Sequence, residues 1–334
     1  MADHLKYIVI PDLELRSGRK QEVSVSYQIF GRELHTAPII LVNHALTGNS
    51  NVPSWWSEIV GNGKTVDLEK YTVLAMDIPG NGYDQVTDHL IFNYQDWCLA
   101  DVGLAFAKAI QTLDIDYIDL GIGGSIGGAL LWEMLALRPK LFGTIVPIAA
   151  DWKSTDWLIA CCHIQETILE NSSKPLETAR QHAMTFYRSP QGLKHKFNRH
   201  QSNGVFKVKQ WLEHHGNALQ ERFSLPSYRL LNHLLWNTNA AAGYEGKIEN
   251  VIQDSDTAIA LMAIDSDGFF LAAEDQETYD RLNKVHPITY QEIHSIHGHD
   301  AFLIEHDQVA FILNQIITNH LERETVTTAV SYSS

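Results

Sequence analysis

Cysteine, positive charge and long apolar runs are scarce in this chain. It has 3 Cys in 334 residues, two of them adjacent at 161–162, and no C-x-x-C pair, so neither a disulfide scaffold nor a zinc ribbon is indicated. Lys and Arg number 25 against 40 Asp and Glu, a net charge of −15. That balance argues against nucleic acid or an anionic membrane as the main partner.

Apolar segments are present but short. No run approaches the roughly 18 residues of a membrane-spanning helix, and residues 1–20 show no apolar core of a secretory signal. With few cysteines as well, we expect a protein of the cytoplasm.

The apolar residues that are present, 45% of the chain, suffice for a large core. The first half alternates short β-branched runs, which end in Gly- or Asn-containing turns, with segments of helical spacing. The expected strands lie within 38–44, 71–82, 116–125 and 141–150, and the expected helices within 96–115 and 126–139. Strands and helices that alternate in this way predict a mostly parallel sheet flanked by helices.

The middle of the chain has a different pattern. Residues 151–245 are rich in Trp, His, Gln and Arg and show helical spacing without a fully apolar β run. The β pattern returns at 256–267 and 287–294, and an amphipathic helix follows. We therefore expect an α/β core formed by 1–150 and 246–334, interrupted by a helical lid at 151–245.

The most specific motif is Gly123-Gly124-Ser125-Ile126-Gly127, which fits G-x-S-x-G and lies between an expected strand and an expected helix. A serine on such a tight turn needs small residues two positions before and after it, and the turn exposes Oγ for nucleophilic attack. A plain Gly-rich turn or a phosphate-binding loop is the alternative. The strand before and the helix after favour the nucleophile.

A serine nucleophile requires a base and an acid that orients the base. In enzymes with this turn the acid follows a late strand and the histidine comes last. Two acids, Asp265 and Asp267, and three histidines, His294, His297 and His299, compete for these roles. A metal site is a minority interpretation, because the histidines are irregularly spaced and no carboxylate or thiolate pattern accompanies them.

The turn at His44–Gly48 follows the first expected strand, where a backbone N–H facing the nucleophile would complete an oxyanion hole. A plain turn is the alternative. A rival motif, Gly63-Lys64-Thr65, resembles the end of a phosphate-binding P-loop. Because Glu58 occupies the position of the required earlier glycine, binding of a nucleoside triphosphate is rejected.

Taken together, HALTGN (44–49), GGSIGG (123–128), the late Ser266-Asp267 and GHDAFLIE (298–305) resemble the homoserine O-acetyltransferase group of α/β-hydrolase-fold acyltransferases. The likeness runs over roughly 35–310. It implies the α/β-hydrolase fold with a helical lid. The roles it implies are nucleophile for Ser125, orienting acid for Asp267, base for His299 and oxyanion N–H donors for Leu46 and Ile126.

The resemblance also implies three substrate-binding residues. Arg180 and Tyr187, in the lid, match the Arg and Tyr with which this family holds homoserine, and Asp300 matches its amine-binding carboxylate. A zwitterionic amino acid requires one cation and one anion, which these residues supply. Taken singly, Arg180 would be read as a solvated helix charge and Asp300 as a turn residue.

The chain departs from the family pattern in three places. The family usually has GGSMGG and HALTGD, and a longer Gly-rich stretch where this chain has IPGNGYDQ (78–85). These loops lie near the mouth of the expected site. The choice of acyl donor and the role of the shortened loop after Gly82 therefore stay open.

The function expected from the resemblance is transfer of an acetyl group from acetyl-CoA, as co-substrate, to the hydroxyl of L-homoserine, a step of methionine biosynthesis. An acyl-serine intermediate and a ping-pong sequence are expected, with no resident cofactor and no metal. A serine esterase or thioesterase, a transferase that uses succinyl-CoA or another hydroxy amino acid, and a non-catalytic binding protein are the alternatives. Partners are expected to be small molecules, and the protein a homodimer.

Overall fold

The computed structural model describes residues 5–331, with side chains as far as residue 320. Its centre is an eight-stranded sheet in the order β1-β2-β6-β3-β7-β8-β11-β12. These strands are β1 (Lys6–Glu14), β2 (Lys20–Gly31), β3 (Ile39–Asn43), β6 (Thr72–Met76), β7 (Ile118–Gly124), β8 (Phe142–Ile148), β11 (Ala258–Ile264) and β12 (Ile288–Ile293).

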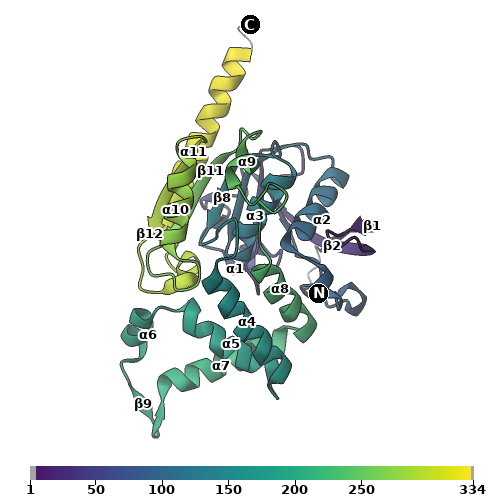
Figure 1. Ribbon diagram of the computed structural model, residues 1–334. Coiled ribbons are helices and arrows are strands. Elements are labelled where there is room, and N and C mark those ends of the chain that lie inside the picture. Colours follow the sequence, from purple (N-terminus) through teal and green to yellow (C-terminus); the bar gives the residue numbers. More distant parts are fainter. Residues whose placement is uncertain (1–4, 332–334) are drawn as a thin grey trace.

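Helices lie around this sheet, and a separate group of them, α4–α8, lies beyond one end of it (Figure 1). The helices are α1 (Val52–Trp55), α2 (Leu99–Thr112), α3 (Ile126–Leu137), α4 (Asp156–Asn171), α5 (Pro175–Tyr187), α6 (Pro190–Phe197), α7 (Lys207–Arg222), α8 (Leu225–Trp236), α9 (Ile248–Ile252), α10 (Ala272–Leu282) and α11 (His306–Ser331). Short strand pairs are β4 (Val60–Gly61) with β5 (Val66–Asp67), and β9 (Gln201–Ser202) with β10 (Val205–Phe206).

Six neighbouring strands of the sheet run in the same direction. β3 pairs in parallel with β6 and β7, β8 with β7 and β11, and β11 with β12. Only β1 and β2 are antiparallel, to each other and, through β2, to β6. The carboxyl ends of the six parallel strands therefore meet at one edge, where such sheets place their ligands.

Both faces of the central strands are buried, which explains their continuous apolar sequences. All five residues of β3 are buried. Ile39 and Leu41 face the core shared with α2, α3 and α10, whereas Ile40 and Val42 face the core shared with α11 and the segment 52–68. The alternation follows the two-residue period of a strand.

The helical group α4–α8 comes between β8 and β11 along the chain, and its apolar side chains join the first of these cores. Its helices have local start signals. Thr155, Ser189 and Ser224 each precede a helix, and each side-chain oxygen accepts a hydrogen bond from a backbone N–H in the first turn. The limits 151 and 245 set from the sequence for this insertion stay a prediction.

The strands expected at 38–44, 71–82, 116–125, 141–150, 256–267 and 287–294 are all present, and so are the two expected helices. The expected mostly parallel sheet flanked by helices is confirmed. The sequence interpretation did not include β1, β2 and α10. Of the described helices, none is both long and apolar enough to cross a lipid bilayer.

The tight packing of α3 against β3 gives the first prediction. In a helix Ala is normally about 1 kcal/mol more stable than Gly, but a Cβ on Gly127 would lie 2.6 Å from the carbonyl oxygen of Asn43. We expect Gly127→Ala to lower the free energy of unfolding by about 1–3 kcal/mol, measured by urea denaturation. The matched control is Gly243→Ala, where a Cβ meets no atom within 4 Å. An equal change in both variants would contradict the proposed clash.

Candidate active site

Ser125 occupies the turn between β7 and α3 in a strained conformation, with φ 58° and ψ −128°. Its backbone N–H donates to the carbonyl of Ile148 at 2.9 Å. No side chain fits at Gly123 or Gly127, two residues to either side of Ser125. A Cβ on Gly123 would lie 2.3 Å from the carbonyl oxygen of Gly127, and a Cβ on Gly127 would lie 2.6 Å from that of Asn43. The sequence thus supplies the small residues that this turn requires.

Ser125, His299 and Asp267 form a continuous hydrogen-bonded chain. Nε2 of His299 lies 2.9 Å from Oγ of Ser125, and Nδ1 lies 2.7 Å from Oδ2 of Asp267. All three residues are buried, at 4%, 3% and 6% exposure respectively. These are the distances that a nucleophile, a base and an orienting acid require.

Backbone N–H groups fix the orientation of Asp267. Its Oδ1 accepts hydrogen bonds from the N–H groups of Phe269 at 2.7 Å and Phe270 at 3.0 Å, which leaves Oδ2 for the histidine. The competing pair lies elsewhere: exposed Asp265 accepts a hydrogen bond from exposed His294 at 3.1 Å. Both acid–histidine pairs therefore form, but within the described residues only the pair Asp267–His299 reaches Ser125.

Aromatic rings surround the histidine. The ring of Phe270 stacks on His299 at 5.5 Å between centroids, while the rings of Tyr187, Phe269 and Phe302 contact it at 5.4–6.1 Å. This burial lowers the pKa of His299, but the charge of Asp267 and its hydrogen bond, followed by the charge of Asp300, raise it more. The net pKa lies above the ordinary value of 6.5.

The turn after β3 packs against the start of α3, where a Cβ on Gly127 would lie 2.7 Å from the carbonyl oxygen of His44. Leu46 is buried, and the N–H groups of Leu46 and Ile126 donate to no backbone carbonyl within the described part of the chain. Ile126 is the first residue of α3, so its N–H is one of the free donors of a helix N-terminus. Free backbone donors such as these are the groups that stabilise an oxyanion, so the oxyanion role of Leu46 and Ile126 stays a prediction.

His44 connects the turn after β3 to the turn after β6. Its Nε2 accepts a hydrogen bond from the N–H of Ile78 at 3.0 Å, and its Nδ1 donates to the carbonyl of Ala45 at 2.8 Å. Burial lowers the pKa of His44, which favours the neutral ring, and because Nε2 accepts a hydrogen bond the ring proton lies on Nδ1. The sequence analysis did not assign a role to His44.

Asp77, to which the sequence analysis also assigned no role, connects the segments that surround the turns after β3 and β6. Its carboxylate accepts hydrogen bonds from the hydroxyl groups of Ser26 and Ser50, each at 2.8 Å, and from the side chain of Asn81 at 3.1 Å. Asp77 and its two serine partners are buried. The only sequence signal for this network was the placement of His44 and Asp77 directly after strands.

The lid contributes the residues expected to bind substrate. Arg180 and Tyr187 lie on α5, with the guanidinium carbon 5.4 Å from the centre of the tyrosine ring, and that ring in turn contacts His299. Among the ion pairs of the described residues none includes Arg180. The guanidinium of Arg180, which is in no described ion pair, thus contacts the Tyr187 ring, and that ring contacts His299.

Asp300 has a partner that the sequence analysis missed. Nε of Arg188, just after α5, lies 3.0 Å from Oδ2 of Asp300, and both side chains are about one-fifth exposed. The contact is an ion pair without the alignment of a good hydrogen bond. The carboxylate next to the base is therefore already accompanied by a cation.

A second contact ties the lid to the oxyanion turn. Arg222, the last residue of α7, donates from Nη1 to the carbonyl of Thr47 at 3.0 Å and from Nη2 to its hydroxyl at 3.4 Å. Thr47 follows Leu46 directly. No local pattern predicts this contact, because 175 residues separate the two partners.

No three His, Cys, Asp or Glu side chains of the described chain are grouped as a metal site would require. His294 and His297, which the alternative metal interpretation of the sequence included, therefore belong to no such group in the described residues. The chemistry this geometry supports is that of a serine nucleophile with a histidine base and two backbone donors.

Comparison with known proteins agrees with this geometry. Residues 38–306 match the alpha/beta hydrolase fold family. A curated homoserine O-acetyltransferase from Salinibacter ruber is 28% identical over 333 residues, which cover 90% of this chain and 94% of that protein.

Among solved structures, a homoserine O-acetyltransferase from Staphylococcus aureus matches with a TM-score of 0.79 and 23% identity, over 94% of each chain. Esterase E22 matches with a TM-score of 0.82 and 14% identity, over 93% of this chain and 98% of the other. At these identities both structures show the fold alone. The predicted resemblance to homoserine O-acetyltransferases is confirmed by the curated relatives, and with it the prediction of an enzyme. The chain belongs to the alpha/beta hydrolase fold family.

Proposed function

We propose that the protein transfers an acetyl group from acetyl-CoA to the hydroxyl of L-homoserine. The observation that carries this proposal is the unpaired Arg180 beside Tyr187, whose ring packs against the base His299. A hydrolase that releases its acyl group to water needs no such cation. An amino-acid acceptor does, because its carboxylate must be held while its hydroxyl meets the acyl carbon.

The first half-reaction follows from the triad. Nε2 of His299 takes the proton of the Ser125 hydroxyl as Oγ attacks the thioester carbonyl, and Asp267 stabilises the imidazolium that forms. The N–H groups of Leu46 and Ile126 donate to the oxyanion of the tetrahedral intermediate. The C–S bond then breaks, His299 returns the proton to the CoA sulfur, and acetyl-Ser125 remains.

The second half-reaction reverses these roles. The acceptor carboxylate pairs with Arg180, and its ammonium group lies near Asp300. His299 takes the proton from the acceptor hydroxyl, which attacks the acetyl carbonyl. When the intermediate collapses, Ser125 leaves and recovers the proton from His299.

Transfer must compete with hydrolysis by water. Aromatic rings contact His299 on several sides, and Ser125 and His299 are at most 4% exposed. These apolar walls limit the entry of water, while Arg180 and Asp300 orient the acceptor. Orientation of this kind supplies several kcal/mol relative to an unbound nucleophile.

An esterase or thioesterase on the same triad is the rival, and succinyl-CoA or another hydroxy amino acid is the alternative within the transferases. We also infer that the protein is a cytoplasmic homodimer without a resident cofactor. Trp157 and Ile164, seven residues apart on one face of α4, are 48% and 46% exposed, and such an apolar surface suits a second copy of the chain.

The direct test is intact-protein mass spectrometry after brief exposure to acetyl-CoA or to succinyl-CoA. We expect wild-type protein to gain one acetyl group from acetyl-CoA and to lose it when L-homoserine is added, because Ser125 is the carrier. Ser125→Ala should stay unmodified. Release of CoA at full rate without homoserine would favour the thioesterase, and a succinyl adduct formed in preference would reassign the donor.

The pH dependence follows from His299. The base must be neutral to accept a proton, and its pKa is raised above 6.5. Acetylation of Ser125 should therefore be fast at alkaline pH and fall on acidification with a midpoint above 6.5, measured by rapid-quench mass spectrometry at several pH values. A rate that stays constant down to about pH 5 would exclude a histidine base.

Asp300→Asn is the control for this pH profile. The charge of Asp300 is one cause of the raised pKa, so its removal should move the midpoint to lower pH while the triad hydrogen bonds stay intact. The acetylation rate at alkaline pH should hardly change. An unmoved midpoint would show that Asp300 does not act on the base.

Arg180→Ala should separate the two half-reactions. Loss of a charge-assisted contact to the acceptor carboxylate should cost roughly 30- to 1000-fold in kcat/KM for homoserine. Acetylation of Ser125 should continue at nearly the wild-type rate, since the acetyl group carries no carboxylate. Lys174→Ala is the matched control, because Lys174 is exposed, directly precedes the same helix and pairs with Glu177. Equal loss in both half-reactions would make Arg180 a structural residue.

A further inference from the structure

One part of this acidic chain has the opposite charge. Residues 188–209, here called the basic arm, contain no Asp or Glu. Their cationic residues are Arg188, Lys194, Lys196, Arg199, Lys207 and Lys209. In a chain of net charge −15, such a segment is an isolated positive region.

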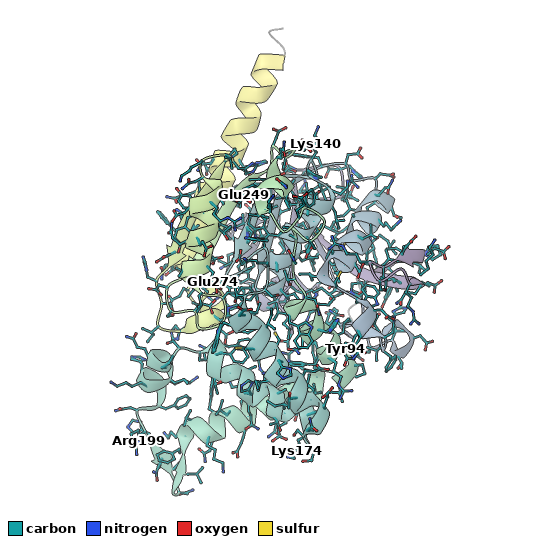
Figure 2. The ribbon with its side chains drawn as sticks, in the orientation of Figure 1. Tyr94, Lys140, Lys174, Arg199, Glu249 and Glu274 are labelled. Carbon is teal, nitrogen blue, oxygen red and sulfur yellow. The ribbon has the colours of Figure 1, made fainter. Side chains whose placement is uncertain are left out.

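The basic arm projects from the molecule. It consists of α6, the β9–β10 hairpin and the start of α7, which extend away from the other lid helices (Figure 1). Arg199 lies near its outer end, and Lys140 lies at the opposite end of the protein (Figure 2). The Lys and Arg side chains from 194 to 209 are exposed.

Few of these charges are offset by carboxylates. Within the described residues, Arg188 pairs with Asp300 and Lys209 with Glu213, while Lys194, Lys196 and Arg199 take part in no ion pair. Aromatic rings support the cations instead. Nζ of Lys196 lies 4.9 Å from the centre of the Trp211 ring, and the guanidinium of Arg199 lies 5.7 Å from that of Phe206.

The basic arm begins at the active site. Arg188, its first residue, contacts Asp300, which directly follows the base His299. Lys196 is near enough that, after partial desolvation, the charge of Arg188 lowers its pKa. Half-buried His215 lies among the same cations, since burial and the charges of Arg180, His214, Arg188 and Lys196 lower its pKa to about 4. Positive charge is thus continuous from the acceptor site to the arm.

We propose that the basic arm binds the phosphate groups of the CoA donor, an inference that rests on the proposed function. CoA carries its thioester at one end of a long chain and a pyrophosphate and a 3′-phosphate at the other. A donor whose carbonyl lies at Ser125 must extend its phosphates outward from the site. Lys and Arg are the residues that bind phosphate through charge-assisted hydrogen bonds.

The charge of the remaining chain favours a compact polyanion over a long one. Nucleic acid that contacted the arm would also approach the acidic surface of the core, which repels it. A nucleotide at the end of a pantetheine chain meets the arm alone. The continuity of the arm with Asp300 favours a ligand that also enters the active site.

The test compares a charged and an uncharged acetyl donor on one variant. Lys194→Gln, Lys196→Gln and Arg199→Gln are combined, and Ser125 acetylation is measured with acetyl-CoA and with the acetyl thioester of N-acetylcysteamine, which has no phosphate. We expect kcat/KM for acetyl-CoA to fall by about 10- to 100-fold, mainly through KM, as three phosphate contacts are lost. The rate with the uncharged thioester should stay within about twofold of wild type.

The matched control removes three exposed lysines from the core: Lys108→Gln, Lys140→Gln and Lys284→Gln. It changes the net charge equally and should leave both donors unaffected. Added salt should weaken the reaction of wild type with acetyl-CoA and have little effect on the arm variant, because screening acts on the contacts already removed. Direct titration of Ser125→Ala protein with adenosine 3′,5′-bisphosphate should show binding that the arm substitutions abolish.

The outcomes separate the two proposals. Equal loss with both donors would make the arm a structural element, and equal activity with acetyl-CoA in wild type and variant would overturn phosphate binding; both leave the proposed function standing. A wild type that accepts the uncharged thioester but not acetyl-CoA overturns the proposed donor and this inference together. Binding of DNA or RNA in place of adenosine 3′,5′-bisphosphate would also overturn the inference.

Discussion

The strained backbone at Ser125 is the constraint on which the rest of the site depends. A positive φ at a residue with a side chain costs about 1–3 kcal/mol, and it is maintained because α3 packs closely against β7 at Gly123 and against β3 at Gly127, where no side chain intervenes. The same turn places Oγ within 2.9 Å of His299 and leaves the N–H of Ile126 free. Nucleophile and oxyanion donor therefore come from one local conformation, and the other site residues are placed relative to it.

The helical insertion is part of the catalytic site as well as its cover. Three contacts connect it to the reacting groups: the Tyr187 ring on His299, Arg188 on Asp300 and Arg222 on Thr47. Each reaches a residue next to, or within, the triad or the oxyanion turn. A movement of the lid would thus change the position of the base and of the oxyanion donor together, whereas the sheet behind them would stay fixed.

Sequence patterns predicted the parts of the molecule that local physics determines. The parallel strands are buried on both faces and appear as continuous apolar runs, and the nucleophile turn has a glycine pattern imposed by close packing. β1 and β2 were not predicted because these antiparallel strands are half-exposed, so that polar residues interrupt their apolar pattern. Pro11 also lies within β1. Residues alone left the choice between Asp265 and Asp267 open, and the family resemblance pointed to Asp267, whose place beside His299 only the fold makes visible.

Long charged side chains are the least predictable component, and Asp300 shows why this matters for function. The family resemblance implied that Asp300 binds the ammonium group of the substrate. In the fold, its carboxylate already forms an ion pair with Arg188. In the proposed function, an acceptor ammonium at Asp300 therefore replaces one cation with another, and its net contribution is only the difference between two ion pairs at a carboxylate that is about one-fifth exposed. The carboxylate contact with Arg180, which has no competing partner among the described ion pairs, must then supply most of the acceptor affinity. In the proposed function, recognition of the amino acid therefore depends on its carboxylate more than on its ammonium group.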